Sequence, residues 1–261
     1  ATTGLILGED WILDAGREAA GFLITSLIRP DGSLWHRYRD GVTGVEGMAQ
    51  DYVFAASGLL ALYQATGEAR YLTVAISLTT TAITGFTDPG RGGLFATREL
   101  DPLVPVRMRD DYDGPVPSVN GHAFRLFTRL AIITGEARFQ SAAQSLVGGM
   151  IPICRQSPTG CLSLLDELMG SGREIRAVLT GNPGEEMRER LCRALIAPYQ
   201  PDLIIVPVRP GDPEILPLIP GAREMLTHPS PAVWICADAT CLPPVDEPDE
   251  LKRVLEEIRR S

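Results

Sequence analysis

Apolar residues recur every three or four positions in several long segments of the chain, which is the spacing of one face of an amphipathic helix. The clearest segments are 52–63 and 123–131. Each is followed by the same motif, Thr-Gly-Glu-Ala-Arg and an aromatic residue, at 66–71 and at 134–139. Glycine ends a helix and an acidic residue favours the start of the next one, so each segment predicts a helical hairpin.

A third copy of this pattern, GEDWILDA, lies at 8–15. In all three copies an alanine follows the aromatic residue by four positions, which places both on one helix face. The aromatic residues are Trp11, Tyr71 and Phe139, spaced by 60 and 68 positions. Internal repeats are typical of stacked units, so we expect these three side chains to be buried at equivalent positions. A unit without a neighbour should expose its apolar helix face, which we expect for 1–7.

Long polar links join the hairpins, at 29–47 and 87–117. Links of this length in a compact domain are usually functional, so we expect any chemistry on the face where they gather. Both links contain runs that predict strands. These runs are 33–38, 94–97 and 104–109.

The pattern changes after Gly149, where short apolar runs alternate with helical segments. We expect a short helix at 161–169, strands at 174–179, 203–208 and 233–237, and helices at 184–196 and 247–260. The order strand, helix, strand is typical of a β-α-β unit. The sequence therefore predicts a mainly α fold, with helical hairpins in 1–170 and a small α/β segment in 171–261 packed on them.

Composition and charge narrow the function classes. Apolar residues make up 44% of the 261 positions, which is typical of a globular protein with a core. The net charge of −9 argues against nucleic acid or an anionic membrane as a partner. No signal peptide or membrane-length apolar run is visible, and five cysteines are an odd number for a disulfide scaffold, so we expect a cytoplasmic protein.

The sequence indicates no metal site and no cofactor. Cys236 and Cys241 lie close together near an expected strand end, but no second pair of ligands accompanies them. They could form a disulfide, although two buried thiols are the favoured interpretation. The segment TGNPG at 180–184 joins a strand to a helix without the Gly-Lys-Ser/Thr of a phosphate loop, and we interpret it as a helix N-cap turn.

Several motifs resemble one known family. They are LWHRYRDG at 34–41, DYVF at 51–54, GGLF at 92–95, RDDYDGPVPSVN at 109–120, and CADATCLPP at 236–244 followed by DEL. Together they resemble the C-terminal part of the spermatogenesis-associated-protein-20-like, thioredoxin-domain-containing proteins. The resemblance implies a partial (α/α) toroid of the six-hairpin glycosidase type. It also implies that a thioredoxin-like domain, absent from this sequence, is a partner within longer members of the family.

The resemblance to a six-hairpin toroid makes carboxylates on the long-link face candidate catalytic residues. Glycoside hydrolysis needs two carboxylates, about 5–5.5 Å apart for retention or about 6.5–9.5 Å apart for inversion. We expect Asp111 and Asp51, each near the start of an inner helix, to form this pair. The alternative is that the aspartates at 110–113 cap backbone amides in a turn and pair with Arg107 or Arg109.

A second set of residues would bind a carbohydrate on the same face. Aromatic, arginine and amide groups suit sugar rings and hydroxyls, and the candidates are His36, Arg37, Tyr38, Tyr52, Asp113 and Asn120. The alternative is a β-hairpin whose aromatic residues pack onto helix ends, as we expect for Trp35. His122, one position into an apolar helix, is interpreted as a core histidine.

Two function classes follow. The first is a carbohydrate-related toroid that binds a sugar or acts on it as a hydrolase or epimerase. The second is a non-catalytic module that binds or docks the thioredoxin-like domain. Convergence of Asp51, Asp111 and Tyr52 in one cavity would favour the first class. Aspartates dispersed among backbone amides would favour the second.

Overall fold

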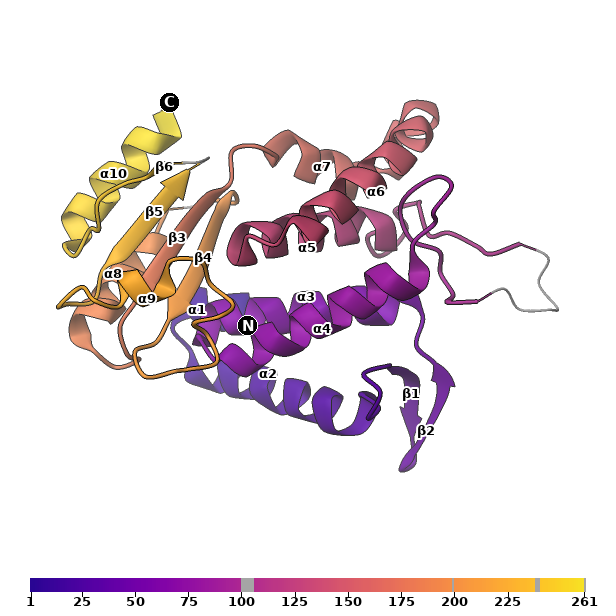
Figure 1. Ribbon diagram of the computed structural model, residues 1–261, viewed down its shortest axis with the longest axis horizontal. Coiled ribbons are helices and arrows are strands. Elements are labelled where there is room, and N and C mark those ends of the chain that lie inside the picture. Colours follow the sequence, from indigo (N-terminus) through magenta and orange to yellow (C-terminus); the bar gives the residue numbers. More distant parts are fainter. Residues whose placement is uncertain (100–105, 199, 238–239, 261) are drawn as a thin grey trace.

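The computed structural model describes residues 1–99, 106–198, 200–237 and 240–260. Within these ranges the mainly α architecture is confirmed, with two small sheets (Figure 1). None of the described helices has the length and apolar character needed to cross a membrane. The helices that precede the larger sheet are α1 (Thr2–Leu7), α2 (Asp10–Phe22), α3 (Ala49–Thr66), α4 (Ala69–Phe86), α5 (Val119–Thr134), α6 (Ala137–Gln156) and α7 (Leu162–Gly170).

Two helical hairpins, α3–α4 and α5–α6, share one turn structure. Gly67 and Gly135 follow the first helix of each pair in the left-handed conformation, with φ of 70° in both. The hydroxyl of the preceding threonine accepts the backbone N–H of the following glutamate at 3.3 Å in one turn and 3.2 Å in the other. The repeated Thr-Gly-Glu motif therefore builds the same turn twice, and the predicted hairpins are confirmed.

The repeated aromatic residues are equivalent in two units but not in the third. Tyr71 and Phe139 are 1% and 0% exposed, and the arginine before each ring lies over it, at 4.6 and 4.7 Å from the ring centre. Trp11 is 69% exposed, so the expectation that it is buried is wrong. The preceding helix explains the difference, because α1 has six residues whereas α3 has 18 and α5 has 16. A helix of six residues is too short to cover a neighbour along its length.

The two long links differ in structure. The first forms the antiparallel hairpin β1 (Trp35–Arg39) and β2 (Val42–Glu46), which projects from the helices in Figure 1. The second link contains only isolated bridges between Thr87 and Leu94 and between Phe95 and Arg109 within its described part. The strand expected at 94–97 is therefore not formed. Part of the strand expected at 104–109 lies outside the described residues.

The C-terminal part contains the predicted β-α-β unit. Strand β3 (Ile175–Thr180), helix α8 (Glu186–Ile196) and strand β4 (Leu203–Val208) place two parallel strands side by side. Strand β5 (Val233–Ala237) pairs antiparallel with β3, and β6 (Thr240–Cys241) pairs with β5. The order across the sheet is β4-β3-β5-β6. Two further helices are α9 (Ala222–Met225) and α10 (Pro248–Arg260).

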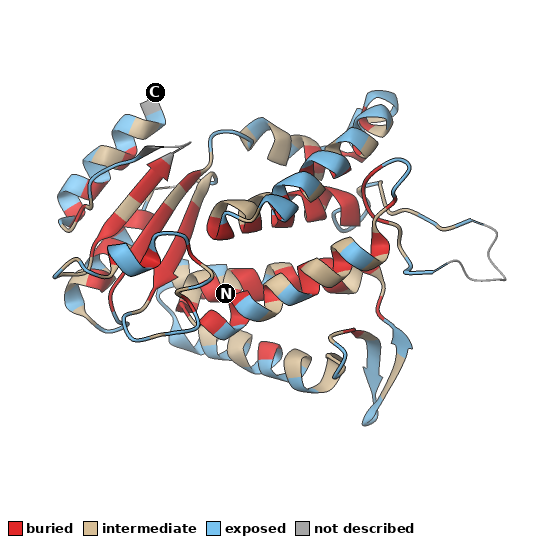
Figure 2. Cartoon of the chain, viewed as in Figure 1, coloured by how far each residue is buried: buried red, intermediate tan, exposed pale blue. Residues whose placement is uncertain are grey.

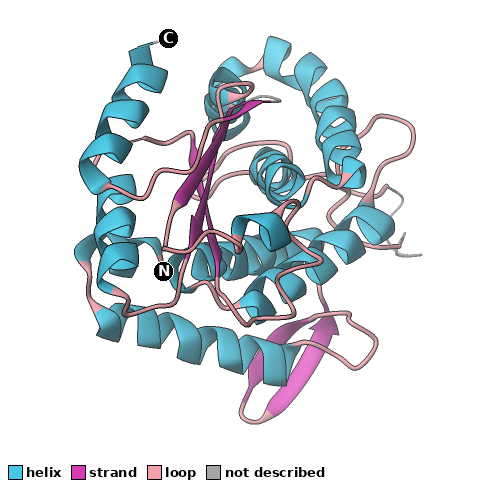
Figure 3. Cartoon of the chain, turned by 60° about the vertical axis from the view of Figure 1, so that its left-hand side comes forward, coloured by secondary structure: helices cyan, strands magenta, loops and turns pink. Residues whose placement is uncertain are grey.

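The larger sheet lies between two helical layers (Figure 3). One face packs its apolar side chains against α8 and α10. The other face packs against α3 and α5 and joins the main core. The hydroxyl of Tyr63 on α3 also donates to the Pro207 carbonyl of β4 at 2.9 Å. The division expected near residue 170 falls between α7 and β3, and it stays a prediction.

Cys236 and Cys241 form a disulfide that connects β5 with β6. The favoured interpretation of two buried thiols is therefore wrong, and the disulfide alternative is the one observed. Register explains the pairing, because the two residues lie directly opposite each other in the antiparallel pair. The other three cysteines are free.

Candidate functional site

The start of α5 organises the segment that the sequence singles out. Asn120, buried in the second position of the helix, accepts the Leu94 N–H at 2.7 Å and donates to the Leu94 carbonyl at 3.0 Å. Its amide also donates to Oδ1 of Asp111 at 2.7 Å. Ser118 caps the helix and accepts the Gly121 N–H at 3.2 Å. One buried amide therefore holds the second link and the Asp111 carboxylate against α5.

Asp111 belongs to a cluster of three charged side chains, with Arg109 and Asp88. The guanidinium of Arg109 donates to Oδ2 of Asp111 at 2.8 Å, to Oδ2 of Asp88 at 3.1 Å and to the Gly92 carbonyl at 2.5 Å. Burial raises the pKa of Asp88, but the N–H groups of Arg91 and Gly90 and the charge of Arg109 outweigh it and hold that pKa below its usual value. Two carboxylates thus share one guanidinium, and the cluster carries a net negative charge.

A cavity of about 460 Å³ lies beside this cluster, between the second link and α6. Its polar lining comes from Arg91, Arg109, Asp111 and Gln156. The link and the helix approach so closely that a Cβ on Gly149 would lie 2.4 Å from the carbonyl oxygen of residue 91. Glycine at this position of α6 therefore allows the wall of the cavity to form.

Asp113 joins three elements rather than facing open solvent. Its carboxylate accepts the Ser118 N–H at 2.8 Å, the Ser163 N–H at 2.7 Å and the Ser163 hydroxyl at 2.6 Å. Burial raises the pKa of Asp113, but these donors outweigh it and hold the pKa below its usual value. The ionised carboxylate therefore ties the second link to the starts of α5 and α7.

Asp51 occupies a different environment at the start of α3. Its carboxylate accepts the Met48 N–H at 2.7 Å, which caps the helix, and pairs with Nδ1 of His36 on β1 at 2.9 Å. Asp51 is not among the described residues that line the cavity beside Asp111. The structure therefore brings Asp51 together with His36, and Asp111 together with Asn120 and Arg109.

The remaining expected sugar-binding residues are on or near the β1–β2 hairpin. Tyr52 is buried, and its hydroxyl accepts the Leu34 N–H at 2.8 Å while its ring packs against Phe86. Tyr38 is exposed and packs edge-to-face on Phe22 with the ring centres 5.0 Å apart. Arg37 lies exposed on β1. The sugar-binding role of these residues stays a prediction.

Sequence reasoning missed Asp88 and Arg91, which belong to the same cluster and cavity. Asp88 precedes Pro-Gly, and Asp before this pair favours a turn in which its carboxylate accepts backbone N–H groups. That signal was available in the sequence. Arg91 and Gln156 carry no local signal, because only the packing of the link on α6 brings them to the cavity.

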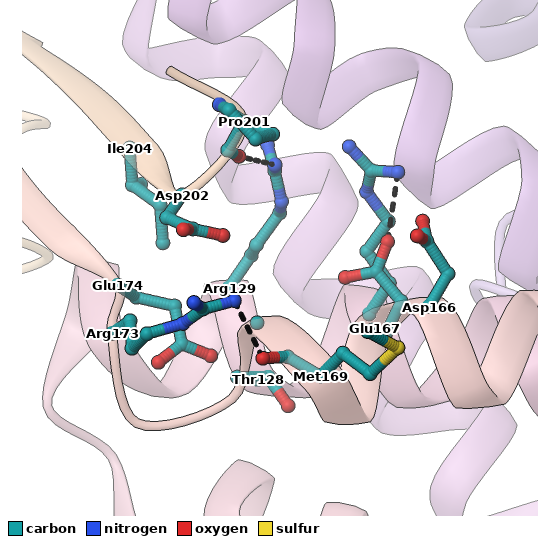
Figure 4. A pocket seen from close by; sticks show the side chains of 12 residues that line it. Thr128, Arg129, Asp166, Glu167, Met169, Arg173, Glu174, Pro201, Asp202 and Ile204 are labelled. Carbon is teal, nitrogen blue, oxygen red and sulfur yellow. Dashed lines mark hydrogen bonds and ion pairs between the residues drawn. The ribbon is translucent and has the colours of Figure 1, made fainter.

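A second charged cavity, of about 300 Å³, lies where α5, α7 and β4 meet (Figure 4). Arg125 pairs with Glu167 at 2.8 Å, and Arg173 donates to the Met169 carbonyl at 2.6 Å. Arg129 donates to the Pro201 carbonyl at 3.4 Å, and burial, aided by the nearby Arg125, lowers its pKa to about 10. The Arg125 contact joins α5 to α7, and the Arg129 contact joins α5 to the residues just before β4, so we interpret this cavity as a structural joint.

His122 lies near this joint and is half-buried. Its ring packs against Phe54 in a tilted arrangement, with the ring centres 4.8 Å apart. Burial lowers the pKa of His122, and the charges of Arg125 and Arg129 lower it further. The histidine is therefore neutral at pH 7. Among the described residues, no group of three or more potential ligands is arranged to hold a metal ion.

Comparison with known proteins supports the family expected from the motifs. The chain is 27% identical to human spermatogenesis-associated protein 20, over 98% of this chain and 34% of the human protein. The mouse protein of the same name gives the same identity and coverage. The chain is homologous to part of spermatogenesis-associated protein 20. An uncharacterized protein of Caenorhabditis elegans is 26% identical, over 97% of this chain and 36% of its own length.

The chain spans about a third of the length of the curated relatives it matches. No family model matches the sequence. The relationship therefore rests on pairwise similarity that extends over nearly the whole chain.

Proposed function

We propose that this chain is a non-catalytic docking module within a longer protein of the spermatogenesis-associated protein 20 family. The observation that carries this proposal is the engagement of the aspartates. Asp51 caps α3 and pairs with His36, and Asp113 accepts three hydrogen bonds from two helix starts. Asp111 is the one carboxylate among the described residues that line its cavity, whereas glycoside hydrolysis needs two.

The N-terminal helices offer the docking surface. Ile6, Leu7 and Trp11 on α1 and α2 are 58%, 62% and 69% exposed. Clustered exposed apolar side chains mark interaction sites, and we propose that these three residues, which we call the α1–α2 face, form one such site. The relatives are about three times as long as the aligned region, so a partner within the same polypeptide fits this face. We propose the thioredoxin-like domain implied by the resemblance as that partner, within a larger (α/α) toroid.

A binding measurement tests this proposal. We expect the part of human spermatogenesis-associated protein 20 outside the aligned region to bind this chain when supplied separately. Trp11→Glu should weaken binding at least tenfold, because it places a charge in the apolar face. Met169→Glu is the matched control, because Met169 is similarly exposed but lies on α7. Absence of binding, or equal weakening by both substitutions, would contradict the proposal.

The cavity beside Asp111 supports a second candidate function, which is carbohydrate binding. The cavity has a volume of about 460 Å³ and is lined by hydrogen-bond donors and acceptors. These belong to Arg91, Arg109, Asp111 and Gln156. A panel of sugars, with binding followed by calorimetry, tests it. We expect Asp111→Asn to abolish binding in a protein that stays folded, and Asp51→Asn to leave binding intact. If Asp111→Asn lowers only the melting temperature, the aspartate has a structural role and the docking proposal stands alone.

A further inference from the structure

The disulfide between Cys236 and Cys241 lies at the edge of the larger sheet. Strand β6, which carries Cys241, is the outermost strand and pairs with β5 alone. Cys236 is 8% exposed, whereas Cys241 is an exposed residue. A reactant in solution therefore approaches the pair from the side of Cys241, since Cys236 is the buried partner.

The bond is poorly suited to a purely structural role. A disulfide stabilises a protein mainly by closing a loop in the unfolded chain, and the effect grows with loop length. The sequence separation here is 5, so the closed loop is short and its entropic contribution is small. The strand that it anchors has two residues.

The backbone around the disulfide is held independently of it. The Leu242 N–H donates to the Ile235 carbonyl at 2.8 Å. Val233 and Val245 exchange two backbone hydrogen bonds, at 2.8 and 2.9 Å. These three bonds keep the chain after β6 against β5 whether the two sulfurs are joined or reduced. A pair that cycles between two redox states needs such a fold, because both states must stay native.

Two of the three free cysteines, Cys161 and Cys192, are poor competitors for this chemistry. Burial, together with a hydrogen bond to Cys154, raises the pKa of Cys161 to about 12. Burial likewise raises the pKa of Cys192. The thiols of Cys161 and Cys192 therefore stay protonated at neutral pH, and the thiolate is the form that attacks a disulfide. Attack on the Cys236–Cys241 disulfide by either of these two thiols is therefore disfavoured.

The geometry points to a thiol–disulfide exchange site at Cys236 and Cys241, with a dithiol as its reaction partner. A thiolate of the partner attacks Sγ of Cys241, which forms a mixed disulfide and releases Cys236 as a thiolate that takes up a proton. The second thiol of the partner, once deprotonated, then attacks the partner sulfur that is joined to Cys241 in the mixed disulfide. This step releases Cys241, which takes up a proton and becomes a thiol. Two electrons pass to the chain, and the partner becomes a disulfide. The reverse sequence reoxidises the pair.

Attack at Cys241 rather than Cys236 follows from access. Exchange requires the incoming sulfur to approach along the axis of the existing bond, so the exposed sulfur is attacked and the enclosed one leaves. The single-cysteine variants separate these roles. Cys236→Ser leaves Cys241 as the remaining thiol, and Cys241→Ser leaves Cys236.

The experiment measures exchange in the folded protein. The chain is equilibrated with mixtures of reduced and oxidised dithiothreitol without denaturant, alkylated with iodoacetamide and analysed by mass spectrometry. We expect one reversible two-electron transition in the peptide that carries both cysteines, while the circular dichroism spectrum stays native. Reduction that occurs only in denaturant, or together with unfolding, would overturn the proposal.

A second measurement tests the direction of attack. Each single-cysteine variant, in a Cys192→Ser background, is mixed with oxidised glutathione, and mixed-disulfide formation is followed over time. We expect Cys236→Ser to react at least tenfold faster than Cys241→Ser, because its remaining thiol is exposed. Equal rates, or a faster reaction at Cys236, would refute the assignment of Cys241 as the attacked residue.

Discussion

Helix α2 and helices α4 and α6 carry the same aromatic-and-alanine pattern, yet only α4 and α6 bury it. Tyr71 and Phe139 lie in the core beneath Arg70 and Arg138, whereas Trp11 is exposed on α2. Figure 2 shows the difference as a buried centre and a largely exposed N-terminal layer. A sequence pattern identifies which face of a helix is apolar, but the length of the neighbouring helix decides whether that face is buried.

The largest expected effect separates these two environments directly. We expect Phe139→Ala to lower the free energy of unfolding by about 3–5 kcal/mol, because it removes a fully buried ring. Trp11→Ala should change it by no more than about 0.5 kcal/mol, because the ring is largely exposed. Urea unfolding of both variants measures the difference. A similar loss in the two proteins would show that α2 packs as α6 does.

The second prediction compares the two long links, of which the second is held against α5 by Asn120. Asn120→Ala should cost about 2–3 kcal/mol, because it leaves the buried Leu94 N–H and carbonyl without their partner. His36→Ala removes a partly exposed ion pair on the β1–β2 hairpin and should cost at most about 1 kcal/mol. Thermal unfolding of the two variants provides the test. A larger loss in His36→Ala would reverse the expected order.

The third prediction concerns the ion pair that attaches α2 to the packed hairpins. Arg17 donates to Glu68, in the turn between α3 and α4, at 2.8 Å. Burial raises the pKa of Glu68, but the hydrogen bond from Arg17 and the charge of Arg70 outweigh it and hold that pKa below its usual value. The pair therefore contributes stability above the usual glutamate pKa and loses it as the pH falls through the lowered one.

We expect Arg17→Gln to speed amide hydrogen exchange in α2 at pH 7 and to leave exchange in α4 and α6 unchanged. In the wild type the same increase should appear as the pH is lowered, after correction for the intrinsic rate. Asp14, which also pairs with Arg17 but is mostly exposed, supplies the control variant Asp14→Asn. If the two substitutions have equal effects, the contact with Glu68 does not anchor α2.

The smallest expected change in the free energy of unfolding comes from removing the hydroxyl of the buried Tyr71 ring. Tyr71→Phe removes the hydroxyl that accepts a hydrogen bond from Arg70 at 2.6 Å. The Arg70 side chain is largely exposed and can turn to water, so the loss should be no more than about 0.5 kcal/mol. In that case the aromatic ring of Tyr71 stabilises the core, and its hydroxyl contributes little. A loss above 1 kcal/mol in urea unfolding would contradict this view.

Much of the fold follows from local sequence signals. Strands β4 and β5 begin and end where their apolar runs do, and the two Thr-Gly-Glu turns form as the repeat predicts. The run at 94–97 fails because a strand needs a partner over several residues, and here only single bridges form. The apolar pattern of a segment therefore predicts a strand well when the strand it pairs with also has such a pattern.

The candidate site was less predictable, because its parts meet only through packing. Asn120 and Asp111 are close in sequence, and their contact could be expected from the motif they share. Asp51 and Asp111 lie 60 positions apart, and their pairing required an assumption about how the inner helices face one another. The structure instead gives Asp51 a helix cap and a histidine partner.

The bond from Tyr63 to Pro207 has a consequence for the order in which the chain is made. The two residues are 144 positions apart, so α3 leaves the ribosome long before the strand that covers it. At about 5–20 residues per second, this interval lasts about 7–30 s. During that time the side of α3 that will meet β4 is open to chaperones and to other nascent chains. Completion of β4 ends this exposure, and a translational pause between the two residues prolongs it.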